Sequence, residues 1–124
     1  MGNFNSGLMW TALNVSAITS IIDSGGLFDG RVIDQKFEGL KTINFYLSGP
    51  YNGALEWNEY NYSVDCRAGT DAESRAIAEA VFDQLNRADF TDYHTNASVL
   101  GTLPPADETD VFNTPVQIIL KSRI

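Results

Sequence analysis

The sequence predicts an α+β fold, in which a mainly antiparallel sheet of about five strands is flanked by two helices in the order α-β-β-β-α-β-β. Apolar residues recur every three or four positions near the N-terminus and again after residue 70, which is typical of helices. Strict alternation of apolar and polar residues from 60 to 68 is typical of a strand. With 124 residues, the chain fits a single domain spanning residues 1–124 around one hydrophobic core.

The first predicted helix runs from about Phe4 to Asp23. Its apolar side chains fall on one helical face, at Leu8, Ala12, Val15, Ile18 and Ile22. We expect the helix to end at Ser24-Gly25-Gly26, because glycine readily adopts the positive φ angle of a helix C-cap.

Two strands are expected next. A short one covers Gly30 to Gln35, and a second covers Thr42 to Leu47 and ends at Ser48-Gly49-Pro50. Tyr51 to Leu55 is predicted to be an exposed connection.

The third strand has the clearest pattern in the chain. Period-two alternation places one set of side chains on a buried face: Tyr60, Tyr62, Val64, Cys66 and Ala68. The other set is expected to face water or a neighbouring subunit: Asn61, Ser63, Asp65 and Arg67.

A second helix is predicted from about Asp71 to Arg87. Thr70 and Glu73 form a capping-box pattern, in which each side chain satisfies a free backbone N–H of the other residue. The apolar stripe of this helix comprises Ile77, Ala80, Val81 and Leu85.

The C-terminal part predicts a hairpin with a long connection. Asn96 to Leu103 and Val111 to Arg123 are the two strands, and the stiff, acidic segment 104–110 joins them.

Charge and composition narrow the possible functions. The chain has 16 acidic and 8 basic residues, a formal net charge of −8 and a pI near 4.3. This balance disfavours nucleic-acid binding, since affinity for DNA comes largely from Lys and Arg displacing counterions. Cys66 is the only cysteine, so the chain cannot form an intrachain disulfide. This cysteine content suits a protein of the reducing cytoplasm. The apolar runs are too short to span a bilayer, so no membrane partner is expected.

No catalytic or metal site is predicted. Cys66 with His94 is the one possible Cys–His pair, but Cys66 falls on the apolar face of its strand, where a thiol usually packs as a small hydrophobe. An acid–base pair of Asp92 with His94 is conceivable, although a solvated turn explains both residues. The acidic residues of segment 104–110 could bind Ca²⁺, yet they lack the spacing and the glycine of an EF-hand loop. We therefore expect no enzymatic activity and no cofactor.

Interface residues are expected instead. Tyr51 and Trp57 lie in or beside a glycine-containing loop, and exposed aromatic residues near glycine are typical of protein interfaces. The long loops from Gly49 to Glu56 and from Pro104 to Asn113 could supply such contacts. The candidate interface residues are Tyr51, Trp57, Pro104, Pro105 and Phe112.

From Tyr60 onward the chain resembles the tail terminator (tail completion) proteins of long-tailed bacteriophages. The shared pattern is a strand ending near a small residue, a short turn, and a helix carrying Ile77-Ala78, Val81 and Leu85. The N-terminal helix with Ala12-Leu13, the strand start at Arg31-Val32 and the end of the hairpin at Lys121-Ser122-Arg123 are also similar. A proline just before the second strand, expected in many relatives, is absent here.

The resemblance implies a homohexameric ring in the neck of a virion, assembled in the bacterial cytoplasm. Such a ring closes the tail tube and joins it to the head connector, so the implied partners are further copies of the chain, the tail tube protein and the head–tail connector protein. DNA would pass through the channel without specific binding. Six copies at −8 each would carry a formal charge of −48, which repels the DNA backbone wherever it faces the channel. Asp107, Glu108 and Asp110 are the candidate channel-facing acids.

Two other functions stay open at this point. The chain could be a different neck protein or a minor tail protein, which the same packing pattern would fit. It could also be a small α/β ligand-binding domain or an enzyme, with a pocket between helix and sheet that uses Tyr62, Cys66 and His94.

Overall fold

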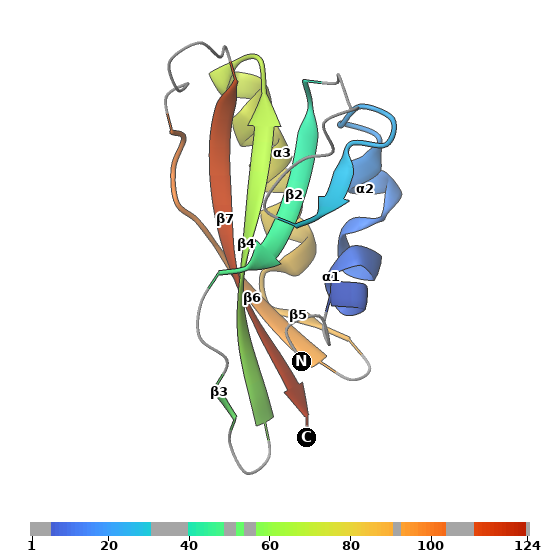
Figure 1. Cartoon of the computed structure of the whole chain (residues 1–124), viewed down its shortest axis with the longest axis vertical. Coiled ribbons are helices and arrows are strands. Elements are labelled where there is room, and N and C mark those ends of the chain that lie inside the picture. The colour runs from blue at the N-terminus through green and yellow to red at the C-terminus, as the bar shows by residue number, and fades with distance from the viewer. Residues whose placement is uncertain are drawn as a thin grey trace.

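The computed structural model describes residues 6–30, 40–48, 52–53, 57–90, 93–103 and 111–123. In this part of the chain, one seven-stranded, mostly antiparallel sheet carries helices on one of its faces (Figure 1). The α+β class is therefore confirmed.

The elements follow one another in the order α-α-β-β-β-β-α-β-β-β. The helices are α1 (Ser6–Leu13), α2 (Ser16–Thr19) and α3 (Asp71–Leu85). The strands are β1 (Leu27–Asp29), β2 (Thr42–Leu47), β3 (Asn52–Gly53), β4 (Trp57–Ala68), β5 (Ala88–Asp89), β6 (Tyr93–Val99) and β7 (Phe112–Arg123). No helix of the described residues is long and apolar enough to cross a membrane.

The strands are arranged in the order β1-β2-β4-β7-β6-β5, and β3 pairs separately with β4. The centre is the antiparallel pair of β4 and β7, which are in register from Trp57 opposite Arg123 to Ala68 opposite Phe112. Among the strands of the described residues, β1 and β2 alone run parallel to each other. Because β4 and β7 are long and central, they hold the rest of the sheet in place.

Most of the predicted strands are confirmed. β2 has the expected bounds, and β4 starts three residues earlier than Tyr60. β6 and β7 form the expected hairpin, but β6 covers Tyr93–Val99 and not the predicted Asn96–Leu103. Three short strands, β1, β3 and β5, were not predicted. Tyr51–Leu55 was predicted to be an exposed connection. This prediction is wrong for Asn52–Gly53, which form β3 by pairing with β4. The strand predicted at Gly30–Gln35 lies outside the described residues except for Gly30, and the strand seen beside β2 is β1.

The single N-terminal helix predicted to reach Asp23 is wrong, because the structure breaks it into α1 and α2. Val15 is the N-cap of α2 and is extended, with φ −124° and ψ 152°. Asn14 and the β-branched Val15 are both weak helix formers, so interrupting the helix at these residues costs little free energy. The break lets Leu13 and Ile18 both reach the core, where each is fully buried.

Gly25 and Gly26 do not cap a helix; they form the turn that leads into β1. Gly25 has a φ of 75°, a left-handed conformation that favours glycine. A Cβ atom on Gly26 would lie 2.8 Å from the carbonyl oxygen of Lys41 and 2.9 Å from that of Asp23. The turn can therefore pack this closely only with glycine at position 26.

The capping of α3 is close to the prediction. Thr70 is extended, and its hydroxyl oxygen accepts a hydrogen bond from the backbone N–H of Glu73 at 3.2 Å. The return contact differs, because the Glu73 carboxylate accepts from the Thr70 hydroxyl at 2.9 Å and not from the Thr70 backbone. At the other end, the hydroxyl of Thr95 on β6 donates to the carbonyl oxygen of Leu85 at 2.7 Å. Both ends of α3 are thus tied down by side chains.

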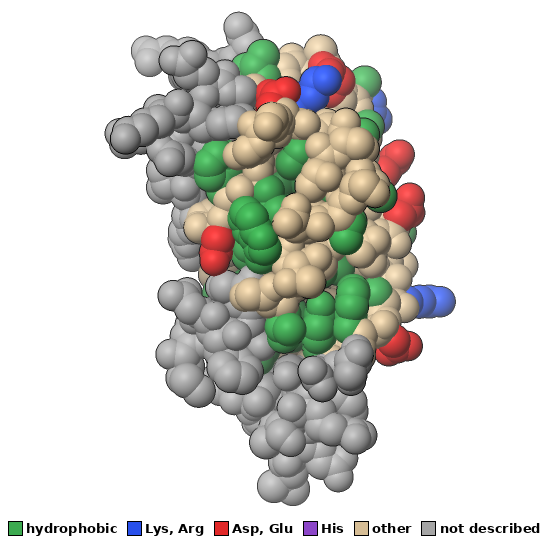
Figure 2. Space-filling view, turned by 90° about the vertical axis from the view of Figure 1, so that its right-hand side faces the viewer, with side chains coloured by type: hydrophobic (Ala, Val, Ile, Leu, Met, Phe, Trp, Pro, Cys, Tyr) green, Lys and Arg blue, Asp and Glu red, His purple; other side chains and the backbone are tan. Residues whose placement is uncertain are grey.

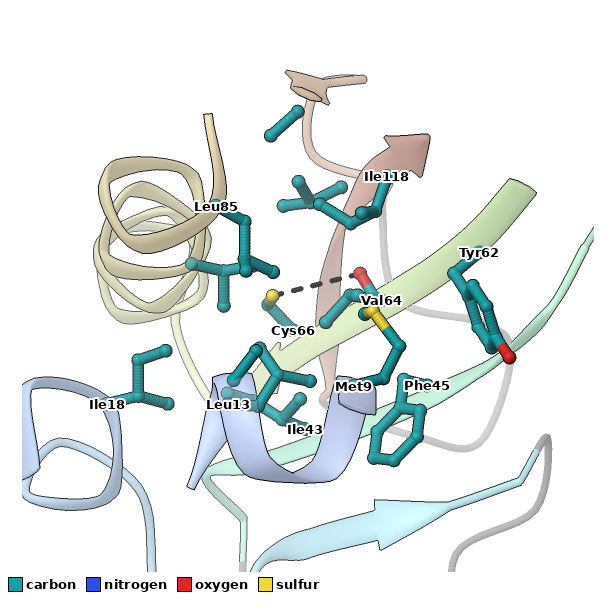
Figure 3. Packing of buried hydrophobic residues seen from close by; sticks show 14 of the residues in the cluster. Met9, Leu13, Ile18, Ile43, Phe45, Tyr62, Val64, Cys66, Leu85 and Ile118 are labelled. Carbon is teal, nitrogen blue, oxygen red and sulfur yellow. Dashed lines mark hydrogen bonds between the residues drawn. The ribbon is translucent and has the colours of Figure 1, made fainter. Parts of the chain in front are cut away.

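The core fills the space between the sheet and the helices. It includes side chains from α1, α3 and the central strands, among them Leu13, Phe45, Val64, Leu85 and Ile118, all fully buried (Figure 3). Burying a side chain of this size contributes about 1.5–3 kcal/mol.

A chain of hydroxyl groups crosses the same space. The Ser74 hydroxyl on α3 donates to the carbonyl oxygen of Cys66 at 2.7 Å and lies 2.7 Å from the hydroxyl of Thr114 on β7. The Thr114 hydroxyl lies 2.9 Å from that of Thr102. These bonds fix how α3 sits across β4 and β7.

Candidate functional site

The residues expected to act as a site lie mostly outside the described part of the chain. This applies to Tyr51, Pro104 and Pro105 and to the acids Asp107, Glu108 and Asp110. For Trp57 the backbone begins β4, but the side chain is outside what the structure describes. Phe112 begins β7 opposite Ala68 and is half-buried. The described residues therefore do not bring the expected interface residues together.

The enzyme-like group expected from Tyr62, Cys66 and His94 does not converge. Tyr62 and Cys66 are buried on the face of the sheet that carries the helices. On β6, Thr95 faces α3 through its bond to Leu85, so the preceding residue, His94, lies on the opposite face. No pocket between helix and sheet can use all three side chains.

The thiol of Cys66 is an inert part of the core, as predicted. The thiol points among aliphatic side chains from α1 and α3 (Figure 3). Its sulfur atom lies 3.8 Å from the carbonyl oxygen of Val64, the one hydrogen bond marked in that view. Burial, with a smaller effect of the Asp65 charge, raises the pKa of the Cys66 thiol far above its ordinary value. A thiol in this state is a poor nucleophile, because the thiolate is the reactive form.

His94 has a partner other than the expected Asp92, which lies outside the described residues. Its Nδ1 atom is 2.7 Å from Oδ1 of Asp89 on β5. This contact joins the short strand β5 to β6 across the sheet edge. Among the residues that the structure describes, no group of three or more His, Cys, Asp or Glu side chains is close enough to hold a metal ion.

The sheet face opposite the helices has a hydrogen-bonded polar centre. The Asn44 amide donates to the carbonyl oxygen of Gly30 at 3.1 Å and to Oδ2 of Asp65 at 3.4 Å. Arg67 lies 3.7 Å from the same Asp65 oxygen. The predicted exposure of Ser63 and Asp65 was wrong, since both are buried. Asp65 is contacted by Asn44 of β2 and Arg67 of β4, and β4 is a central strand with neighbours on both sides.

The first surface that could bind a partner lies over α1, α2 and the start of β1. A hollow of about 440 Å³, called the helical hollow here, is lined by Trp10, Asn14, Thr19, Ile22 and residues 23–27. Trp10 and Ile21 are 40% and 37% exposed, although both are large and apolar. Figure 2, which views the molecule from the right-hand side of Figure 1, shows hydrophobic side chains in several patches over this face, with the charged ones mostly near its margins.

One ionisable side chain lines the helical hollow, and its charge is already stabilised. Oδ2 of Asp23 accepts hydrogen bonds from the backbone N–H groups of Leu40 and Lys41, at 2.7 and 2.9 Å. Residues 6–22 contain no ionisable side chain. The hollow therefore has a largely uncharged wall in an acidic protein.

A second exposed apolar region, called the β6 tip here, comprises three large apolar side chains at and just after the end of β6. Their exposed fractions are 42%, 61% and 53% for Val99, Leu100 and Leu103. Residues 95–103 contain no ionisable side chain. Exposed apolar side chains that occur together usually mark an interaction surface.

The edge of the sheet beside the β6 tip is open. β5 pairs with β6 at His94 and Thr95 only, and no strand in the described ranges pairs with Asn96–Val99 on that side. The N–H of Ala97 donates to the side chain of Asn86 at 3.4 Å. An edge strand with so little cover offers backbone groups for pairing with another chain.

Sequence reasoning missed both surfaces. The signal that could have found them is the absence of charge over residues 1–22 and 95–106 in a chain with a net charge of −8. Hydrophobic periodicity alone could not, because it does not reveal which apolar side chains the fold leaves exposed.

Comparison with known proteins finds a likeness in structure only. No known family profile matches the chain, and no curated protein matches it in sequence. A chain in a solved structure described as the virion of a native gene transfer agent (GTA) particle is similar, with a TM-score of 0.61 and 12% sequence identity. The match covers 93% of this chain and 91% of that one. The two chains therefore share a fold over nearly their full lengths.

Proposed function

We propose that this chain is a structural protein of a tailed virion or virion-like particle. The observation that supports this most strongly is the likeness in fold, over almost the whole length of both chains, to a subunit of a gene transfer agent virion. A fold by itself does not imply function. The partly apolar surfaces at the helical hollow and the β6 tip, which carry little charge, add independent support, because assembly proteins need such surfaces.

Within the particle, we assign the chain the role of tail terminator. In this role six copies form a ring that caps the tail tube and joins it to the head connector. The ring lies in the neck and is assembled in the host cytoplasm, with the tail tube protein and the connector protein as its partners. The sequence pattern from Tyr60 to Leu85 supports this role, and the structure realises that pattern as β4, a short turn and α3.

The proposed role requires neither catalysis nor a cofactor. Tyr62, Cys66 and His94 do not share a pocket, and the Cys66 thiol is held in its neutral form. The ring instead acts by shape and charge. With a net charge of −8 per chain, an acidic channel wall repels the DNA backbone and lets the genome pass.

Deleting the gene from a producing strain and restoring it in trans tests this role. Without the chain, we expect filled heads and tails that remain separate, and the wild-type gene should restore joined particles. Normal particles in the deletion strain would contradict the proposal. Joined particles with defective tail tips would instead indicate a minor tail protein.

The channel acids can be tested in the same system. Replacing Asp107, Glu108 and Asp110 together by Asn should leave particles joined and slow DNA ejection most at low salt, where charges are least screened. Unchanged ejection at low salt would remove these residues from the channel wall.

A further inference from the structure

We propose that the β6 tip of one copy docks into the helical hollow of the next copy, which gives a head-to-tail contact. This contact would build the ring of the proposed function. It rests on that function only in the assumption that successive contacts close into a ring. The occupant of the hollow is thus a second copy of the same chain.

The positions of the two surfaces support a head-to-tail contact. In the strand order, β1 is at one end of the sheet and β6 is next to the other end. The last part of β6 runs along the left-hand edge of the molecule, while α1, α2 and β1 lie along the right-hand edge (Figure 1). Two different patches on opposite edges of one subunit generate a heterologous contact, which leads to rings or filaments and not to a closed pair.

Charge supports a second copy as the partner. Two chains that each carry −8 repel one another, so a contact between copies is most favourable where neither surface adds negative charge. The β6 tip lacks ionisable side chains, and the hollow carries only the Asp23 carboxylate, which already accepts hydrogen bonds from the backbone N–H groups of Leu40 and Lys41. The exposed side of α3, in contrast, carries Asp71, Glu79 and Asp83 and would repel another copy.

The chemistry of the two surfaces is complementary. Leu100 is the most exposed large apolar side chain among the described residues, and Val99 and Leu103, close to it in the chain, are exposed as well. Trp10, Ile22 and Leu27 give the hollow apolar walls. Docking removes apolar area from water on both sides, which is the main driving force of such contacts.

Disulfide trapping tests the contact directly. Asn14 lines the hollow and is exposed, so we would prepare the variants Asn14→Cys and Leu100→Cys as separate proteins. The native Cys66 is buried and should not react. Under mild oxidation of concentrated protein, we expect a covalent dimer in the mixture of the two variants and little in either variant alone. A mixture without the dimer, or Leu100→Cys pairing mainly with itself, would overturn the proposal.

A matched pair of charge variants tests the same contact without cysteine chemistry. Leu100→Glu and Lys121→Gln each make the chain more negative by one charge at an exposed position, but Lys121 lies opposite His94, at the other end of β6 and on the sheet face opposite the helices. We expect Leu100→Glu to weaken self-association by at least tenfold in sedimentation velocity, because the tip loses its apolar burial. Lys121→Gln should stay within about twofold of the wild type, a size typical of a screened surface charge. Equal effects of the two variants, or a wild-type chain that stays monomeric at high concentration, would overturn the contact.

These outcomes separate the contact from the proposed neck role. If the chain is absent from purified particles but forms the mixed dimer, the contact is supported and the neck role is contradicted. If the chain is present in the particles but its Asn14→Cys and Leu100→Cys copies do not cross-link, the neck role is supported and the contact is contradicted.

Discussion

Two helical regions cover the same face of the sheet, and they are built differently. α3 is a 15-residue helix with a capped N-terminus and acidic residues on its exposed side. α1 and α2 have 8 and 4 residues, no side-chain cap hydrogen bond at the start of α2, and no ionisable side chain. They also leave the large apolar side chains of Trp10 and Ile21 exposed.

This difference separates stability from assembly. α3 is fastened to β4, β6 and β7 by buried hydroxyl groups and by a continuous apolar stripe, and its outer surface suits water. α1 and α2 contribute buried residues too, but their outer surface suits another protein. We infer that the fold depends mainly on α3 and the central strands, while α1 and α2 provide a docking surface.

The largest effect should come from a matched pair of core truncations. Leu85 of α3 and Leu13 of α1 are both fully buried, so Leu85→Ala and Leu13→Ala remove the same atoms. Each should lower the free energy of unfolding by about 2–5 kcal/mol, with Leu85→Ala at the upper end, since short helices can shift to fill a cavity more easily. Urea denaturation measures both. A larger loss for Leu13→Ala would break the proposed division between the two regions.

The buried hydroxyl of Ser74 should have the next largest effect. Ser74→Ala leaves the carbonyl oxygen of Cys66 and the hydroxyl of Thr114 without this partner, and we expect a loss of about 1–3 kcal/mol. Ser20→Ala, at an exposed position after α2, serves as the control and should change stability by less than about 0.5 kcal/mol. Equal losses in thermal unfolding would show that the hydroxyl chain does not fasten α3.

A reciprocal exchange at the two helix starts sharpens the comparison further. Thr70→Val removes the cap of α3 and should cost about 1 kcal/mol, whereas Val15→Thr offers a hydroxyl to α2 and should raise stability by up to about 1 kcal/mol. The two residues have nearly the same shape, so the space they fill changes little, although the hydroxyl at half-buried Val15 reduces the gain there. If both exchanges lower stability in urea, capping does not distinguish the two helices.

The smallest effect should be a dependence of stability on pH that involves Glu73. Its hydrogen bond from Thr70, followed by the contact with Lys41, lowers the pKa of the Glu73 carboxyl group in the folded protein. A lowered folded pKa means that the stabilising effect is present above the ordinary pKa of about 4.3 and is lost as the pH falls through the folded value. We expect the stability difference between wild type and Glu73→Gln to shrink between about pH 5 and pH 3. A difference that stays constant over this range would contradict the assignment.

The regions also differ in how far the sequence predicts them. The signals for β4 and α3 are local, because strict alternation and the pattern of Thr70 with Glu73 each span only a few residues. The break between α1 and α2 has no such signal, since Leu8, Ala12, Val15 and Ile18 keep helical spacing across it. It arises from packing, which brings Leu13 and Ile18 into one core.

The candidate surfaces were harder to predict than the fold. The exposure of Val99 and Leu100 depends on β5 being too short to cover the end of β6, and β5 itself exists only through pairing with His94 and Thr95. The buried state of Asp65 likewise depends on Asn44 and Arg67 from the surrounding sheet. Such features follow from tertiary contacts, which periodicity along the chain does not contain.

Counting this chain in purified particles tests the central claim most directly. Quantitative mass spectrometry with isotope-labelled peptides gives the number of copies per particle, and labelling an epitope tag shows where they lie by electron microscopy. The account predicts six copies per particle, all at the junction of head and tail. Absence from the particles, or a copy number that grows with tail length, would contradict it.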